Sequence, residues 1–220
     1  MNRPRRFDLI AFDWDGTLID STALIVQCMQ AACRDLALAV PSDERAAYVI
    51  GLGLQDALRH VVPDLPPERY PELGLRYRRH YVARQHEPVL FAGALAMLHE
   101  LRARNYWLAV ATGKTRRGLD EALAQTRLGP VFDGTRTADE TASKPSPLML
   151  QELMREFGVE PERTLMIGDT THDLQLAANA GAACVGVSYG AHDGAAFAPF
   201  APLYVADSTA ALHRWLADNA

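Results

Sequence analysis

The chain has 220 residues, 49% of them hydrophobic, which is enough apolar material to bury the core of one or two domains. Its net charge is −5 and it has no long basic run, so the composition argues against nucleic acid binding. The three cysteines are odd in number and lack metal-ligand spacing, which argues against both a disulfide framework and a zinc site.

The first predicted element is a buried strand over Leu9–Phe12, which leads into Asp13-Trp14-Asp15-Gly16-Thr17. Gly16 permits the sharp turn that ends the strand. In an extended chain, residues i and i+2 point the same way, so Asp13 and Asp15 should converge at the carboxyl end of the strand. Because two close carboxylates repel each other, either one keeps a proton or a cation sits between them.

The segment after this strand is far longer than one crossover connection requires, so it must hold an inserted domain. Its pattern is helical, and four residues with helical spacing line one side of an expected helix: Tyr70, Leu73, Tyr77 and Tyr81. The expected division is an α/β core formed by residues 1–19 and 87–220, with a helical domain over residues 20–86.

Two features of the inserted segment bear on a ligand. Gly51-Leu52-Gly53 favours a turn between helices, and a loop that approaches a substrate closely is the alternative interpretation. A group of basic residues favours a solvated helix face, although it could attract an anion: Arg76, Arg78, Arg79, His80 and Arg84. With little support for nucleic acid, we expect a small anionic substrate.

The next strand, predicted over Leu108–Ala111, leads into Thr112-Gly113-Lys114, just before a helix expected to begin near Thr115. A hydroxyl and backbone N–H groups at a helix start suit an anion. Further along, Ser143-Lys144-Pro145-Ser146-Pro147 places a lysine before another helix. Ser146 is the expected N-cap of that helix, with the following proline at its first position.

Lysine is rare in this chain. Of the 22 basic residues, 20 are arginine, and the two lysines are Lys114 and Lys144. Because lysine is a compact point charge and arginine a broad planar fork, the exception suggests a narrow site built around one oxygen. Lys114 has two open interpretations, as an outer phosphate contact or as a surface residue at a helix start.

A third strand, predicted over Leu165–Ile167, runs into Gly168-Asp169-Thr170-Thr171-His172-Asp173 and so supplies further acids. Two or three carboxylates suit Mg²⁺, which prefers hard oxygen ligands in an octahedron and keeps several waters. A helix is expected from about Asp173 to Ala180, ended by Gly181 in the left-handed conformation.

The predicted strands alternate with helical stretches, and further strands are expected at Ala183–Val187 and Tyr204–Ala206. This alternation predicts an α/β fold with a doubly wound parallel sheet. Ligands of open α/β sheets bind outside the carboxyl ends of the strands, where Asp13, Thr112 and Asp169 all fall.

At this point four motifs resemble, in order, those of the haloacid dehalogenase superfamily: Asp-x-Asp-Gly-Thr at Asp13–Thr17, the Thr at Thr112, the Lys at Lys144, and Gly-Asp-x-x-x-Asp at Gly168–Asp173. The match spans nearly the whole chain. Asp13–Ser21 and Lys144–Pro147 look like the phosphoglycolate phosphatase-like subgroup. One departure is Gly113-Lys114, where many relatives carry an asparagine after the Thr or Ser, and this bears on substrate positioning.

The resemblance implies a role for each matching residue. Asp13 would be the nucleophile that forms an aspartyl-phosphate, and Asp15 the general acid and base. Thr112, Gly113 and Lys144 would bind the phosphate. Mg²⁺ would be held by Asp13, Asp169 and the backbone carbonyl of Asp15, with Asp173 orienting these ligands or Lys144. A small helical cap would close over the phosphate, with hinges near Leu18–Asp20 and Glu87–Phe91.

The implied activity is a Mg²⁺-dependent phosphomonoesterase that acts on a small phosphorylated metabolite, with 2-phosphoglycolate as one candidate. A sugar phosphomutase and a non-catalytic binding protein are the alternatives. The inserted segment contains no lysine for a Schiff base, which argues against a phosphonate hydrolase of this superfamily. Asp15 argues against a dehalogenase, because such enzymes lack the second aspartate of the first motif.

Two further expectations concern the surface and the compartment. Because Asp15 already fills the acid–base role, His172 is expected to face solvent or to cap a helix. The segment after the basic Met1–Arg6 is too short and polar for a signal-peptide core, and no stretch is apolar enough to span a membrane. We expect a cytoplasmic protein.

Overall fold

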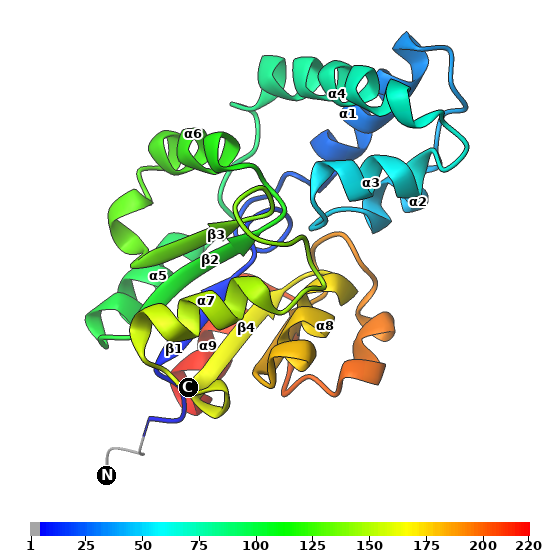
Figure 1. Ribbon diagram of the computed structural model, residues 1–220. Coiled ribbons are helices and arrows are strands. Elements are labelled where there is room, and N and C mark those ends of the chain that lie inside the picture. Colours follow the sequence, from blue (N-terminus) through cyan, green and yellow to red (C-terminus); the bar gives the residue numbers. More distant parts are fainter. Residues whose placement is uncertain (1–4) are drawn as a thin grey trace.

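The computed structural model describes residues 5–220, so the first four residues of the Met1–Arg6 segment lie outside it. Six parallel strands form one sheet in the order β3-β2-β1-β4-β5-β6 (Figure 1). The strands are β1 (Leu9–Phe12), β2 (Trp107–Thr112), β3 (Gly134–Thr137), β4 (Thr164–Gly168), β5 (Ala183–Val187) and β6 (Val205–Ala206). The predicted doubly wound parallel sheet is confirmed.

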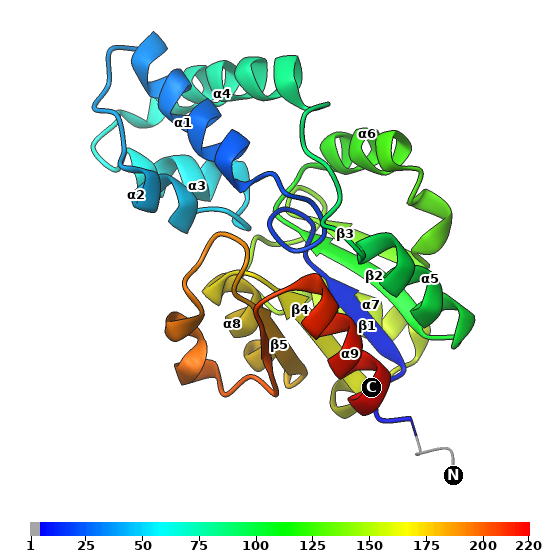
Figure 2. The same ribbon diagram turned by 180° about the vertical axis from the view of Figure 1, so that it is seen from behind.

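Helices cover both faces of this sheet, because side chains alternate in direction along each strand. Ile10 and Phe12 pack with α5 (Ala94–Ala103) and α9 (Thr209–Asn219) on one face, which Figure 2 shows in front. Leu9 and Ala11 pack with the helices of the opposite face, α7 (Leu148–Phe157) and α8 (Thr171–Ala180). Within the described residues, no helix combines the length and apolar character needed to cross a membrane.

The strand register brings the predicted motifs to one edge of the sheet. Phe12 lies opposite Val110 of β2 and Ile167 of β4. The residues that follow these three strands therefore meet at their carboxyl ends. The chain passes from β1 to β2 and β3 on one side of β1, then returns from β3 to β4 on the other side. Such a switch point leaves a crevice for a ligand.

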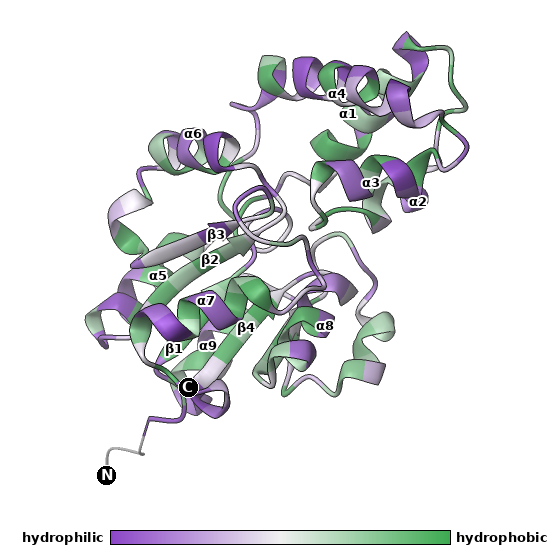
Figure 3. Cartoon of the chain, viewed as in Figure 1, coloured by the Kyte–Doolittle hydropathy of each residue, from purple (hydrophilic) through white to green (hydrophobic). Residues whose placement is uncertain are grey.

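The strand β3 was not predicted from the sequence. Its residues Gly-Thr-Arg-Thr are polar, and Figure 3 shows it purple to white, whereas β2 and β4 are largely green. As an edge strand it pairs only with β2, so its sequence lacks the apolar run of a central strand. The apolar-run criterion cannot detect such a strand.

Helix ends follow the predicted capping residues in two of three cases. Helix α6 (Arg116–Thr126) begins after Thr115, whose side chain accepts from the Gly118 N–H, and α8 ends at Gly181 with a positive φ. The expected start of α7 was wrong by one residue, because Pro147 occupies the N-cap and Leu148 is the first helical residue.

The inserted segment folds as four α-helices and one short 3₁₀ helix, which lie together at one end of the molecule (Figure 1). They are α1 (Thr22–Asp35), α2 (Asp43–Tyr48), α3 (Leu54–Val61), η1 (Pro67–Arg69) and α4 (Tyr70–Arg84). The segment has a hydrophobic cluster of its own, which includes Met29, Leu58 and Leu73. The predicted helix through Tyr70 and Tyr81 is confirmed.

Two antiparallel connections join this helical segment to the sheet. The Asp20 N–H donates to the Val89 carbonyl at 2.9 Å, and the Phe91 N–H donates to the Leu18 carbonyl at 3.0 Å. These are the two stretches expected to act as hinges. Because they are hydrogen-bonded side by side, a bend in one requires a bend in the other.

Three short 3₁₀ helices lie in connections of the sheet domain, after α6, α7 and β5. They are η2 (Gly129–Val131), η3 (Pro161–Arg163) and η4 (Gly194–Phe200). The last of these places Phe197 against the α7–α8 face of the sheet. None of the three contains a residue of the predicted motifs.

Candidate active site at the carboxyl ends of the strands

Asp13 follows β1 directly and is buried. Its backbone N–H donates to the Ile167 carbonyl at 2.8 Å, which fixes the residue against β4. The Lys144 ammonium donates to Asp13 Oδ1 at 2.7 Å, whereas Oδ2 is a buried oxygen with no hydrogen-bond partner among the described residues. A buried carboxylate oxygen without a partner is costly, so this atom is a candidate ligand or nucleophile.

Asp169 follows β4 and is enclosed by backbone. The Thr17 hydroxyl donates to its Oδ1 at 2.8 Å, and the Ala191 N–H donates to its Oδ2 at 2.7 Å. A Cβ added at Gly16 or Gly190 would lie within 2.3 Å of Asp169 Oδ2. Gly16 also has a positive φ of 79°, so two glycines leave the room that this carboxylate occupies.

Asp173 lies in the first turn of α8, and both of its oxygens are used. Its Oδ1 accepts from Lys144 at 2.6 Å, while its Oδ2 accepts from the Thr170 N–H and hydroxyl at 3.1 and 2.7 Å. Thr170 and Asp173 form a capping box at the helix start. Asp173 is thus placed by its own helix, and in that place it holds the lysine beside Asp13.

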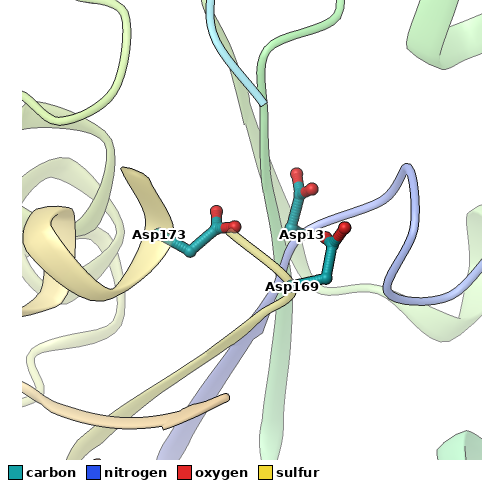
Figure 4. A group of neighbouring side chains, drawn as sticks. All are labelled: Asp13, Asp169 and Asp173. Carbon is teal, nitrogen blue, oxygen red and sulfur yellow. The ribbon is translucent and has the colours of Figure 1, made fainter. Parts of the chain in front are cut away.

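The three carboxylates form one acidic group. Asp13, Asp169 and Asp173 each offer an oxygen, and these oxygens lie within 4.8 Å of one another. Figure 4 shows Asp13 and Asp169 side by side, with Asp173 approaching from α8. Burial and the neighbouring acids Asp173 and Asp15 raise the pKa of Asp13 to about 7, although Lys144 opposes this shift. Burial, Asp13 and Asp173 also raise the pKa of Asp169.

These residues fit a hard divalent cation. The donor set consists of carboxylate oxygens, which Mg²⁺ prefers, and one of the oxygens on Asp13 lacks a partner. The Lys144 charge compensates only part of the acidic group. Burial alone would lower the pKa of Lys144, but Asp13 and Asp173 outweigh it and hold that pKa above its ordinary value.

Asp15 makes contacts of its own, and its charge also raises the pKa of Asp13. The expected convergence of the two carboxylates stays a prediction. Within the described residues, the acidic group does not include Asp15. The Ser21 hydroxyl donates to its Oδ1 at 2.7 Å, and the Lys114 ammonium lies 3.0 Å from its Oδ2. Each aspartate of the first motif thus has one lysine beside it.

Lys114 is nearly buried and joins the sheet to the helical segment. Its ammonium donates to the Tyr81 hydroxyl at 2.8 Å as well as contacting Asp15. Burial would lower the pKa of Lys114, but Asp15 and Tyr81 raise it above its ordinary value. Of the two interpretations left open by the sequence, the surface residue is wrong.

Thr112 and Gly113 lie at the end of β2, across from Asp13. Thr112 is buried, and its hydroxyl accepts from the Lys114 N–H at 3.2 Å. A Cβ at Gly113 would lie 2.4 Å from the Leu52 carbonyl oxygen and 2.5 Å from that of Gly51. The Gly51–Gly53 loop therefore does reach the candidate site, and it is also a turn between α2 and α3.

Comparison with known proteins agrees with this arrangement. Residues 10–187 match the family described as haloacid dehalogenase-like hydrolase. The chain belongs to this family. It is 36% identical over 191 residues to a "Probable phosphatase IndB" from Dickeya dadantii, covering 84% of this chain and 82% of that protein. It is also 31% identical over 208 residues to a phosphoglycolate phosphatase from Aliivibrio fischeri, covering 90% and 92% of the two chains.

Solved structures show the same fold. A hydrolase from Pseudomonas syringae superposes with a TM-score of 0.88 at 23% identity, covering 97% of this chain and 99% of that chain. At this level of identity the likeness concerns the fold. The present chain therefore shares its fold with a protein of quite different sequence.

The expectation that His172 faces solvent or caps a helix was wrong. In this hydrolase His172 is buried, and its Nε2 donates to the Tyr48 carbonyl at 2.7 Å. His192 Nε2 donates to the same carbonyl at 3.0 Å, while its Nδ1 accepts from the Thr171 N–H. Burial lowers the pKa of both imidazoles. Together they attach α2 of the helical segment to the start of α8 and to the loop after β5.

Several contacts of the site were not singled out from the sequence. Ser21 and Tyr81 hold Asp15 and Lys114, and Thr17 holds Asp169. Thr17 and Ser21 lie within the quoted motif stretch, so the motif contained a signal that had no assigned contact. Tyr81 carries no such signal, because its partner is 33 residues away.

Proposed function

We propose that this hydrolase is a Mg²⁺-dependent phosphomonoesterase that cleaves a small phosphorylated metabolite through an aspartyl-phosphate. The observation that carries the proposal is the state of Asp13. One of its oxygens is fixed by a fully buried lysine, and the other is buried without a partner beside Asp169. A carboxylate oriented in this way is prepared for attack on phosphorus, because orientation removes much of the entropic cost of reaction.

Two in-line transfers complete the proposed reaction. In the first, the Asp13 carboxylate bonds to phosphorus while the ester bond breaks, and Asp15 delivers a proton to the leaving oxygen. In the second, Asp15 takes a proton from water as the water oxygen attacks the same phosphorus. The acyl phosphate bond then breaks, which frees inorganic phosphate and restores Asp13.

The remaining site residues neutralise charge on the phosphoryl group, whose transition state is loose and spreads negative charge over its oxygens. Lys144, the Thr112 hydroxyl and the Gly113 N–H are the proposed phosphate contacts. Mg²⁺, when bound, would screen the phosphoryl charge from the acids. Asp13, Asp169 and the backbone carbonyl of Asp15 are its proposed ligands, and Asp173 is proposed to keep Lys144 in place.

The domain division that we propose follows the paired connections. Residues 1–19 and 87–220 form the catalytic core, and residues 20–86 form a cap that closes over the phosphate. Three contacts between the parts support this division: Lys114 with Tyr81, Gly113 with the Leu52 carbonyl, and the two histidines with Tyr48. A cytoplasmic location stays a prediction.

A direct assay tests the proposal. Phosphate release from an aryl phosphate should require Mg²⁺, and Asp13→Asn should abolish it. Release that is unaffected by chelation and by this variant would overturn the proposal. A panel that includes 2-phosphoglycolate and a hexose 1-phosphate tests the alternatives, because isomerisation faster than any hydrolysis would establish the phosphomutase instead.

A further inference from the structure

A large cavity lies between the proposed cap and the core. Its volume is about 600 Å³, within the range of pockets that hold drug-sized ligands. Asp15, Gly113 and Lys114 line it on the core side, so it opens directly onto the site where the phosphoryl group would react. Because Asp15 is the proposed acid for the leaving oxygen, a group on that oxygen would extend into this cavity.

The cap contributes mostly apolar side chains to the cavity. Helix α1 contributes Ile25 and Met29, and the loop before α3 contributes Leu52. Helix α4 contributes Tyr77 and Tyr81, whose rings stack with centroids 6.0 Å apart. The surface of these walls is mostly apolar and aromatic. The tyrosine hydroxyls are its polar groups, and that of Tyr81 is already held by Lys114.

The charged groups of the cavity are either paired or exposed. Lys114 is held by Asp15 and Tyr81, and Arg117 forms an ion pair with Glu121 at 2.9 Å. The other two cations in the lining, Arg78 and Arg79, are exposed on α4. Among the described lining residues, none offers a buried cation that is free to bind a carboxylate close to the phosphate.

We propose that the natural substrate carries a large apolar leaving group, of the size of a ring system or a medium alkyl chain, which fills this cavity. The inference rests on the proposed phosphomonoesterase function and gives its substrate class. A two-carbon acid such as glycolate would leave most of the cavity unfilled. It would also place its carboxylate against apolar walls, which is unfavourable without a paired cation.

The experiment measures kcat/KM of the wild-type, Mg²⁺-loaded protein for ethyl, butyl and hexyl phosphate and for 2-phosphoglycolate. The three alkyl alcohols are nearly equal as leaving groups, so a difference in rate reports binding of the chain rather than intrinsic reactivity. Burial of each added methylene should raise kcat/KM by about fourfold. The kcat/KM for hexyl phosphate should then exceed that for 2-phosphoglycolate.

A matched pair of variants tests the site itself. Ile25 and Val26 are neighbours on α1 and are equally buried, at 8% and 9% exposure, but only Ile25 lines the cavity. Ile25→Thr should flatten the rise of kcat/KM with chain length. Val26→Thr introduces the same hydroxyl facing elsewhere and should keep the wild-type rise.

The possible results separate this inference from the proposed function. Asp13-dependent hydrolysis with no rise along the alkyl series, or with 2-phosphoglycolate as the best substrate, would overturn the inference alone. An equal loss of the rise in both threonine variants would also overturn it. If no ester is hydrolysed in an Asp13-dependent reaction, the proposed function fails and the inference fails with it.

Discussion

Each of the two lysines in this chain contacts one of the two aspartates of the first motif. Lys144 contacts Asp13, and Lys114 contacts Asp15. Both ammonium groups lie among close oxygen partners, in space that a guanidinium would overfill. The rarity of lysine therefore has a structural explanation at these two positions.

Lys144→Arg is the sharpest test of this explanation. The charge is kept, but the side chain is fully buried between Asp13 and Asp173, so the larger planar group must displace one of them. We expect kcat/KM to fall by about a hundredfold. Arg155→Lys, an exposed position on α7, is the control and should retain the wild-type rate. A rate near wild type for Lys144→Arg would contradict the point-charge role.

The raised pKa of Asp13 predicts how the folding stability of the metal-free protein depends on pH. Its pKa is raised to about 7 in the fold, so the folded protein holds this proton more tightly than the unfolded chain does. That contribution is present at low pH and is lost as the pH rises from about 4 to about 7. Asp13→Asn should therefore stabilise the protein more at pH 8 than at pH 5, by on the order of 2 kcal/mol.

Denaturant unfolding in the presence of a chelator measures this difference. The exposed Asp64 provides the control, since Asp64→Asn should leave the pH dependence of the wild type unchanged. An equal effect of Asp13→Asn at both pH values would mean that the buried carboxyl is not protonated in this range.

At the scale of elements, loops and helix starts bring the site together. The capping box fixes Asp173 at the start of α8, and the register of β1 against β4 fixes Asp13 beside Asp169. The Gly51–Gly53 loop reaches over from the cap, and its Gly53 N–H donates to the Ser143 hydroxyl at 2.8 Å, next to Lys144. The proposed cap thus contacts both segments that are proposed to bind phosphate.

Gly113→Ala tests the closest of these contacts. The added Cβ would lie 2.4 Å from a backbone oxygen of the cap loop, which cannot rotate away as a side chain can. We expect the cap loop to shift and kcat/KM to fall at least about tenfold. Gly129→Ala, where a Cβ meets no atom within 4 Å, is the control. Unchanged kinetics in Gly113→Ala would show that this approach does not matter for turnover.

At the scale of the whole molecule, acids from two strands and one helix accumulate where a cation would relieve their repulsion. A ligand that binds only the folded state stabilises it, by about 2.7 kcal/mol at a hundred times its Kd. Mg²⁺ should therefore raise the Tm of the wild-type protein, and this does not depend on any substrate.

Thermal unfolding with and without Mg²⁺ checks this prediction. Asp169→Asn should remove the Mg²⁺-dependent rise in Tm, because Asp169 is a proposed ligand within the acidic group. Asp64→Asn should retain the rise. A full rise in the Asp169 variant would place the cation elsewhere.

Much of this fold could be predicted from the sequence because its signals are local. The buried central strands are apolar runs, and the ends of α6 and α8 carry their own capping residues. The edge strand β3 escaped prediction because it is polar, and the start of α7 was displaced because Pro147 took the cap position. Both errors arise where a local pattern is weak or ambiguous.

The sequence by itself determined the parallel α/β core, the inserted helices and the four motifs, because each is encoded in a contiguous stretch. Only the tertiary structure decided which charges meet. The lysine partners of Asp15 and Asp13 lie 99 and 131 residues away, and the carbonyl that holds His172 is 124 residues away. Contacts of that kind depend on how the sheet and the cap are packed, and no local pattern encodes them.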